Sequence, residues 1–166
     1  MADTTPIEKL QPCLLDRLTD NEPKMREEGR AHRIVSNQKY RRGVLRDLEW
    51  LFNTVGYIRT GDLEPFRLKD YPEAYRSVIN YGTRQLCGVG HPDLDQLRAD
   101  LIELIRMFEP RIEARSLVVK VDIVGNIITF RLEGTLWANP IPEQLNVKTS
   151  LDIETGLCVL GDVPNG

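Results

Sequence analysis

The sequence contains few of the residues from which metal sites and disulfide frameworks are built. Among 166 residues there are only two histidines, His32 and His91, and three cysteines, Cys13, Cys87 and Cys158. No two cysteines stand at the spacing of a CxxC pair, and the histidines are far apart, so no zinc chelate can be identified. We interpret the histidines as solvent-facing loop residues and the cysteines as small apolar side chains. The sequence therefore predicts no metal, no cofactor and no disulfide framework.

Long hydrophobic runs are also missing. A membrane-spanning helix needs ~20 consecutive apolar residues, and no run approaches that length. Residues 1–12 do not combine a basic stretch with an apolar one, as a secretory signal does. We therefore expect a cytoplasmic protein without membrane insertion.

The excess of positive charge that is typical of nucleic-acid-binding proteins is absent as well. Lys and Arg number 22 against 25 for Asp and Glu, which gives a formal net charge of -3. A nucleic-acid-binding domain is usually clearly basic, so we expect no nucleic-acid partner. Apolar residues make up 41% and charged residues 28%, which is typical of a folded chain with one hydrophobic core.

Catalytic motifs cannot be identified either. The chain has no GxSxG motif, and the glycine-rich segment at residues 88–93 lacks the last glycine of a GxGxxG phosphate-binding loop. Carboxylates are abundant, but nothing in their spacing pairs two of them across a cleft, as glycoside hydrolysis requires. These carboxylates include Asp62, Glu64, Glu103, Glu109 and Glu113. The residues alone favour a protein that is not an enzyme.

The beginning of the chain is its least regular part. Residues 1–35 hold several prolines and a charged stretch, and we expect an irregular arm with one short helix. Leu14, Leu15 and Leu18 would form the apolar side of that helix. Residues 36–166 are expected to form a single domain.

Apolar residues with a period near 3.6 predict a long helix at residues 37–53. Ser36 precedes it as the N-cap, since its hydroxyl can accept from the backbone N–H groups that open a helix. A shorter helix is expected at residues 73–80, ended by Gly82 in the left-handed conformation.

A second long helix is predicted after Asp93, which can form a capping box with Gln96. Its apolar stripe is that of an ordinary core-facing helix. It should end at about Glu109, because Pro110 disfavours helical geometry at the residue before it.

The rest of the chain alternates with a period of two, which predicts strands. Three runs, at residues 117–123, 128–136 and 145–153, alternate apolar and polar side chains, and a short fourth run follows at 157–160. Gly125–Asn126 fits a hairpin turn between the first two. Alternation of this kind is typical of an antiparallel sheet with one face on helices and one in water. The predicted fold class is α+β, with N-terminal helices packed on a C-terminal antiparallel sheet of three to four strands.

The tripeptide Glu109–Pro110–Arg111 lies between the second long helix and the sheet. The simpler interpretation is a helix stop flanked by two surface charges. The alternative is a rigid, presented pair, because proline fixes φ near about -65° and an arginine fork suits bidentate binding of a carboxylate. In that case Glu109, Pro110 and Arg111 form a docking point for another protein.

Four segments, taken together and in this order, carry a family resemblance. They are LLDRL at 14–18, VLRDLEWLFNT at 44–54, SVINYG at 77–82 and FEPRI at 108–112. Their order and spacing resemble the TssE family, the small baseplate components of bacterial type VI secretion systems. That family is related to a baseplate wedge protein of contractile-tailed phages and is often labelled "lysozyme-like".

The resemblance implies a structural, non-catalytic part of a cytoplasmic baseplate. Its partners would be the baseplate subunits TssF, TssG and TssK, and it would provide a platform on which the sheath of TssB and TssC begins to polymerise. The family's named motif corresponds to Glu109, Pro110 and Arg111, and Leu14 to Leu18 would pack in the wedge. The family label leaves a peptidoglycan hydrolase as one alternative, and a regulatory adaptor of the same fold as another.

The run at residues 145–153 contains no proline, and its polar positions are not strongly alike in charge. We therefore expect a lightly defended sheet edge there. Together with the resemblance to a sheath platform, this predicts that Val147 or Thr149 pairs with a sheath strand by β-augmentation.

Overall fold

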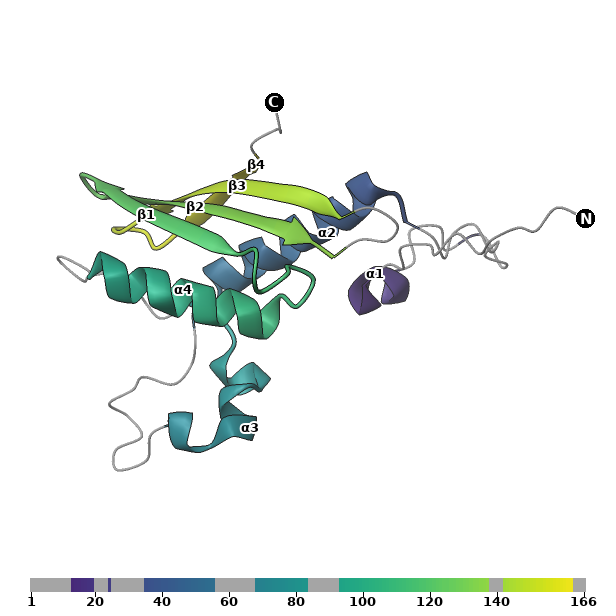
Figure 1. Cartoon of the computed structure of the whole chain (residues 1–166), viewed down its shortest axis with the longest axis horizontal. Helices are drawn as coiled ribbons and strands as arrows, with labels where there is room; N and C mark the ends of the chain where they lie inside the picture. Colours follow the sequence, from purple (N-terminus) through teal and green to yellow (C-terminus); the bar gives the residue numbers. More distant parts are fainter. Residues whose placement is uncertain are drawn as a thin grey trace, which may run out of the picture.

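A sheet and two long helices form two layers, with the helices on one face of the sheet (Figure 1). The predicted α+β architecture is confirmed. The computed structural model describes residues 13–19, 24, 35–55, 68–83, 93–137 and 142–162. His32, Cys87, His91 and most of the expected N-terminal arm lie outside these ranges. Among the described helices, none combines the length and apolar composition that crossing a bilayer demands.

Helix α2 (Asn37–Asn53) begins where its cap residue predicts. The hydroxyl of Ser36 accepts a hydrogen bond from the backbone N–H of Lys39 at 3.2 Å. Val44 and Leu48 are fully buried and belong to the apolar stripe that the sequence indicates. The prediction for residues 37–53 is confirmed.

Helix α4 (Leu94–Phe108) begins after Asp93, whose carboxylate accepts from two backbone N–H groups of the first turn. The capping box is only half formed, because the Gln96 amide bonds to Asp100 at 2.9 Å and does not return to the cap residue. The helix ends before Glu109, whose φ of -124° is no longer helical. The following proline accounts for this end point.

Four antiparallel strands form a meander in the order β1-β2-β3-β4. The strands are β1 (Val118–Val124), β2 (Ile127–Leu136), β3 (Glu143–Asp152) and β4 (Cys158–Asp162). The predicted two-residue turn joins β1 to β2, with Gly125 at a φ of +61°. A positive φ suits glycine because it has no Cβ to clash.

The core lies between the sheet and the two long helices. Alternate residues of the strands point into it, as the period of two predicts. Its members include Leu48, Leu101, Ile105, Val119, Ile128, Leu132, Leu136, Leu145, Val147 and Leu151. The opposite face of the sheet is polar for most of its length and faces solvent, as is common in antiparallel sheets.

The prediction that β3 is an open edge is wrong. Between Val147 and Leu151 this strand pairs with β2 on one side and with β4 on the other. The side chains of Val147 and Thr149 are fully buried. The short last run forms a partner strand for this half of β3, so the outer strands of the sheet are β1 and β4.

Strand β4 is attached to the end of α2 through one side chain. The Asn53 amide donates to the carbonyl of Cys158 at 2.9 Å and accepts from the backbone N–H of the same residue at 2.9 Å. Since both backbone groups of Cys158 bond to this helix side chain, they point away from β3.

The remaining helices are short. They are α1 (Leu14–Leu18), the 3-10 turns η2 (Leu68–Asp70) and η3 (Val78–Asn80), and α3 (Pro72–Tyr75). The helix expected at residues 73–80 is therefore divided into α3 and η3. Gly82 has the predicted positive φ, and an added Cβ there would lie 2.3 Å from the carbonyl oxygen of Thr54.

Candidate interaction site around Arg111

The Arg111 guanidinium binds two carboxylates of its own chain. Its Nε donates to Glu109 Oε1 at 2.6 Å, and its Nη2 donates to Glu109 Oε2 and, at 2.6 Å, to Asp47 Oδ2. The backbone N–H of Arg111 also donates to Glu109 Oε1 at 3.2 Å. Arg111 therefore forms the expected bidentate pair with a carboxylate, but this carboxylate belongs to Glu109 of the same chain and not to a partner.

The three residues of the predicted docking point differ in exposure. The Glu109 side chain is 3% exposed, the Arg111 side chain is 20% exposed, and Pro110 is exposed. The expectation of two presented charges is therefore wrong for Glu109. A carboxylate is stable in such a position only when it is paired and hydrogen-bonded, and Arg111 provides both.

Arg111 keeps its charge in this environment. Burial alone would lower the pKa of its guanidinium, but the bonds to Glu109 and Asp47 outweigh burial and raise that pKa above its ordinary value. The guanidinium is thus a permanent cation that joins two acids from different parts of the chain.

The ion pairs continue from Asp47 to α1. Arg46 contacts Asp47 Oδ1 at 2.8 Å and donates to Asp16 Oδ1 at 2.5 Å and to Cys13 Sγ at 3.3 Å. Burial tends to raise the pKa of Asp16, but the bonds from Arg46 and Cys13 hold it below the ordinary value. We call the five residues Glu109, Arg111, Asp47, Arg46 and Asp16 the charge chain. It connects the turn after α4, helix α2 and helix α1.

Gly43 makes room for the charge chain on the surface of α2. An added Cβ would lie 3.3 Å from Asp16 Oδ2 and 3.9 Å from Arg111 Nη1. Sequence reasoning missed Gly43, Arg46, Asp47 and Asp16 as parts of one site. Gly43, in the middle of a predicted helix, was the signal that could have indicated this site. Glycine inside a helix reduces stability by about 1 kcal/mol relative to alanine, so its presence usually has a packing reason.

Backbone hydrogen bonds hold the Arg111 turn against the end of β2. The N–H of Trp137 donates to the Arg111 carbonyl at 2.7 Å, and the Tyr40 hydroxyl donates to the Trp137 carbonyl at 3.0 Å. Ile112, which is buried, forms an isolated bridge with Leu136. The turn is therefore fixed to both layers of the fold.

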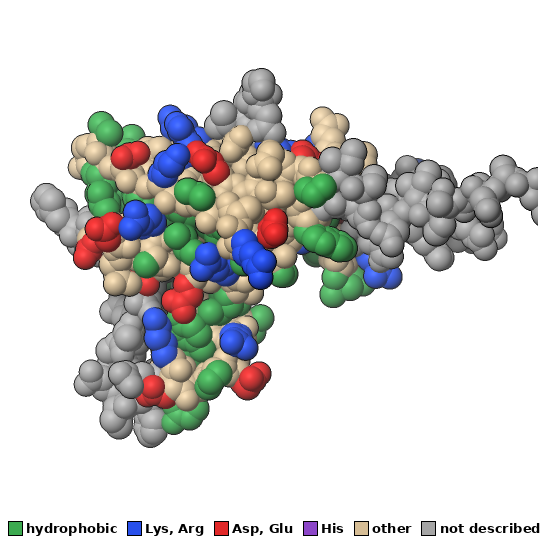
Figure 2. All heavy atoms as spheres, viewed as in Figure 1, with side chains coloured by type: hydrophobic (Ala, Val, Ile, Leu, Met, Phe, Trp, Pro, Cys, Tyr) green, Lys and Arg blue, Asp and Glu red, His purple; other side chains and the backbone are tan. Residues whose placement is uncertain are grey.

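Helix α1 presents its leucines to solvent. Leu14 and Leu18 are 70% and 73% exposed, Leu15 is 39% exposed, and no residue of α1 is buried. Hydrophobic side chains lie on the molecular surface at the position of α1 (Figure 2). The polar contacts of Cys13 and Asp16 with Arg46 attach this helix to α2, and Leu14 and Leu18 remain mostly exposed.

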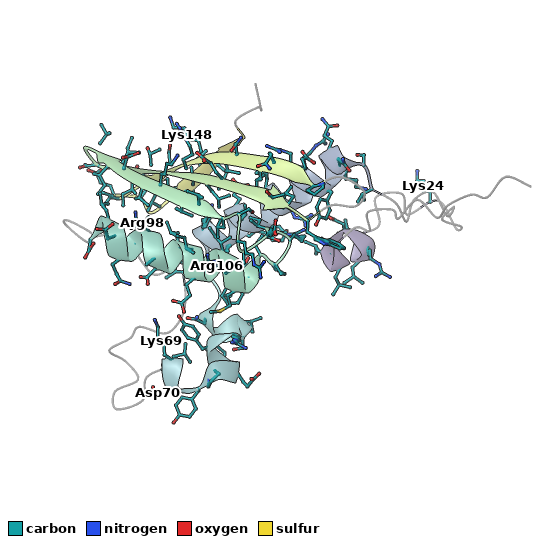
Figure 3. All side chains as sticks on the ribbon, viewed as in Figure 1. Lys24, Lys69, Asp70, Arg98, Arg106 and Lys148 are labelled. Atoms are coloured by element: carbon teal, nitrogen blue, oxygen red, sulfur yellow. The ribbon has the colours of Figure 1, made fainter. Side chains whose placement is uncertain are left out.

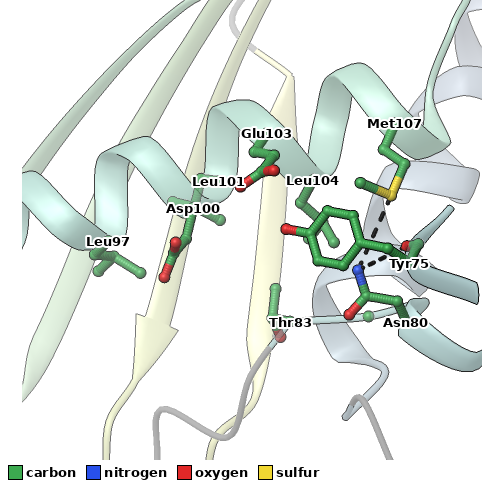
Figure 4. Close-up of a pocket in the computed structure, with 10 residues that line it drawn as sticks. Tyr75, Asn80, Thr83, Leu97, Asp100, Leu101, Glu103, Leu104 and Met107 are labelled. Atoms are coloured by element: carbon green, nitrogen blue, oxygen red, sulfur yellow. Dashed lines mark hydrogen bonds between the residues drawn. The ribbon is translucent and has the colours of Figure 1, made fainter. Parts of the chain in front are cut away.

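A pocket lies between α4 and the short helices (Figure 4). Its two carboxylates, Asp100 and Glu103, stand on the same helix, opposite Tyr75 and Asn80. Glycoside hydrolysis needs carboxyl groups on both sides of the scissile bond, and this pocket has them on one wall. Among the described residues there is also no group of His, Cys, Asp or Glu that could hold a metal ion.

Comparison with known families finds a match. The model of a family described as baseplate wedge protein gp25 matches residues 38–141. This range includes α2 except its first residue, α4, the Arg111 turn, β1 and β2. A search of curated proteins finds no match. A search of solved structures finds none.

Proposed function

Because the chain belongs to the family of the baseplate wedge protein gp25, which is also the family of TssE, we propose that it is a non-catalytic subunit of a type VI secretion baseplate. In this role it joins the wedge in the cytoplasm and provides the platform from which the contractile sheath polymerises. The observation that carries the proposal is the family match over residues 38–141, and the charge chain supports it. Residues that could have served catalysis or binding are used to hold α1, α2 and the Arg111 turn in one arrangement.

Helix α1 is the proposed contact with the wedge. Leu14, Leu15 and Leu18 form an exposed apolar side, and burying one leucine stabilises an interface by roughly 1.5–3 kcal/mol. The salt bridge of Asp16 with Arg46 orients this side before the partner arrives. The partners we propose are TssF, TssG and TssK.

The tripeptide Glu109–Pro110–Arg111 supports the same contact indirectly, by holding the residues that orient α1. Arg111 holds Asp47, and Asp47 contacts Arg46, the residue that binds α1. The 20% of the Arg111 side chain that remains exposed leaves room for one further acceptor from a partner. We therefore keep this motif in the proposed interaction site, with Glu109 as an internal support.

Sheath subunits, TssB and TssC, are proposed to pair with an outer strand, β1 or β4. Counting from the turn, hydrogen-bonded and non-hydrogen-bonded residue pairs alternate between β1 and β2. Val121 belongs to a non-hydrogen-bonded pair, so its N–H points away from β2, at the free edge of β1. At β4 the same reasoning, starting from Cys158, directs the N–H of Leu160 outward. Val147 and Thr149 are left with a supporting role inside the sheet.

The wedge contact is tested by co-purification from cells that carry a type VI secretion cluster. Leu14→Asp with Leu18→Asp should remove TssF, TssG and TssK from the purified complex. Val78→Asp, at a position 85% exposed on η3, is the matched control and should retain them. Equal recovery of the three partners with both variants would exclude α1 as the contact.

The platform role is tested by counting fluorescent sheaths in cells. A proline has no N–H, so Val121→Pro or Leu160→Pro should reduce sheath number if that edge receives a strand. Alanine at the same two positions controls for the lost side chain. Normal sheath numbers with both folded proline variants would contradict pairing at either edge.

Catalysis is tested separately with a peptidoglycan suspension. The purified protein should not clear it, and Glu109→Gln should behave in the same way. Clearing by the wild type that is lost in Glu109→Gln would overturn the non-catalytic role.

A further inference from the structure

The face of the sheet that points away from α2 and α4 carries a row of three cations. The strand register pairs Lys120 with Arg131, Arg131 with Lys148, and Lys148 with Gly161. The three charged residues are exposed. In Figure 3 Lys148 projects on the side of the sheet opposite to α4.

This arrangement is unfavourable for the isolated fold. Side chains directly opposite each other on neighbouring strands are close, and like charges there are destabilising. Lys120 is compensated by Glu133, with 3.2 Å between its Nζ and Oε1. Arg131 and Lys148 have no ion pair in the described part of the chain, so two adjacent cations are left without an acid.

The same face is apolar near the turn between β1 and β2. Val124 is 75% exposed and is paired with Ile127, which is 48% exposed. Val159, on β4, is 56% exposed. It is paired with Ser150, which stands two residues from Lys148. Two residues along a strand correspond to roughly 7 Å, so one bound segment can reach both the apolar and the cationic side chains.

We propose that this open face of the sheet binds an acidic segment of a partner protein. Its carboxylates would lie over Arg131 and Lys148, and an apolar side chain next to them would contact Val159. A second apolar side chain further along the segment would contact Ile127 or Val124. The surface is distinct from the α1 leucines and from the strand edges, so it goes beyond the function proposed above.

Other occupants fit this face less well. A second copy of the chain would bring the same two cations together if the faces met symmetrically. A nucleic acid carries negative charge along its whole backbone and needs a wider basic surface than two cations without ion pairs. A short segment can place its carboxylates at Arg131 and Lys148 and avoid Asp122, which is exposed between the apolar and cationic residues. A protein segment with both carboxylates and apolar side chains satisfies both parts of the surface.

The binding experiment uses a short fluorescent peptide that contains glutamate and leucine. Its affinity for the full chain is compared with those of two control peptides, one with glutamine for glutamate and one with serine for leucine. We expect both controls to bind more weakly by at least about tenfold, because each lacks one of the two complementary features. No binding of the first peptide, or equal binding of the three, overturns the proposal.

Charge reversal locates the binding. Arg131→Glu with Lys148→Glu should reduce the affinity for the first peptide by more than about tenfold. Arg98→Glu with Arg115→Glu alters the net charge equally at exposed positions outside the sheet and should leave the affinity nearly unchanged. Equal losses would indicate a non-specific charge effect and overturn the site. Tighter binding of a single-stranded oligonucleotide, lost in the same sheet variant, would also overturn it.

A stability measurement distinguishes this site from a merely structural one. Lys148→Thr removes the repulsion from Arg131, so the melting temperature should rise while peptide affinity falls. A melting temperature that falls together with affinity would mean that Lys148 supports the fold, and would contradict the proposal.

Discussion

Asp47 and Arg111 stand 64 positions apart in the chain, and their Oδ2 and Nη2 atoms are 2.6 Å apart. This ion pair joins the middle of α2 to the turn that follows α4. Because Asp47 also contacts Arg46, which binds Asp16, the pair connects the buried Glu109 to a helix on the surface.

Replacement of Arg111 by alanine should destabilise the isolated domain. It would leave the buried Glu109 without its cation, and removal of one partner from a buried pair costs about 3–5 kcal/mol. Partial exposure of Arg111 places the expected loss near the lower limit. Chemical denaturation measures it, with Arg115→Ala at an exposed position as the control. A loss below about 1 kcal/mol, typical of surface sites, would mean that Arg111 serves a partner alone.

Replacement of Asp16 by asparagine should detach α1 from α2, with little effect on the free energy of unfolding of the protein. Helix α1 buries no side chain, and partly exposed salt bridges contribute about 0–1 kcal/mol. Hydrogen exchange of residues 13–19 should become faster while α2 and α4 remain protected. Asp95→Asn, with a highly exposed side chain, is the control. Unchanged exchange in α1 would contradict this attachment.

The same contact should depend on pH. The pKa of Asp16 is lower in the folded protein than in the unfolded chain, so its contribution is present above the unfolded value of about 3.9. The contribution is lost as the pH falls through the lower, folded value. The protection factors of α1, which correct the exchange rates for the intrinsic pH dependence of amide exchange, should therefore fall only at acidic pH. A fall between pH 6 and 8 would point to another group.

Replacement of Gly43 by alanine should separate helix stability from α1 attachment. Alanine is favoured over glycine inside a helix by about 1 kcal/mol, but its Cβ would approach Asp16 Oδ2 to 3.3 Å. Since Asp16 belongs to a helix that buries nothing, it can move aside. We expect a melting temperature equal to or above that of the wild type, together with faster exchange in α1. Slower exchange in α1 would show that the alanine Cβ fits beside Asp16 and strengthens the attachment of α1.

The thiol of Cys158 should be unreactive in the folded protein. Burial raises the pKa of this thiol to about 12, and the negative charge of Glu49 acts in the same direction. Almost no thiolate is then present near pH 8. Ellman's reagent, applied to a variant with Cys13→Ser and Cys87→Ser, should react slowly until denaturant is added. Fast reaction in the native state would mean that β4 opens readily.

The parts of the fold that depend on local signals could be predicted from the sequence. Ser36 and Asp93 each cap a helix by accepting hydrogen bonds from the first turn that follows them. The Gly125–Asn126 turn sets the register of β1 with β2. These signals act between residues close in the chain. They therefore remain visible without a structure.

The remaining features depend on contacts between distant residues. The position of β3 inside the sheet is decided by its pairing with β4, which alternation within one run does not reveal. Likewise, Asp16 and Arg46 are 30 positions apart, and nothing in either segment indicates that they meet. Sequence reasoning identified Glu109 and Arg111 as a pair of charges. Only the structure shows that Arg111 donates to Glu109 and that the Glu109 side chain is buried.

The bonds of Asn53 to Cys158 have a consequence for the order of folding. They join residues 105 positions apart, so the end of α2 receives its last partner only when nearly the whole chain is available. Contacts of such long separation slow folding, because a large loop must close before they form. During synthesis α2 can therefore pack on β2 and β3 first, and its last residue bonds to the sheet only after β4 has left the ribosome. Chains cut short before β4 would then leave the edge of β3 between Val147 and Leu151 unpaired, and should aggregate.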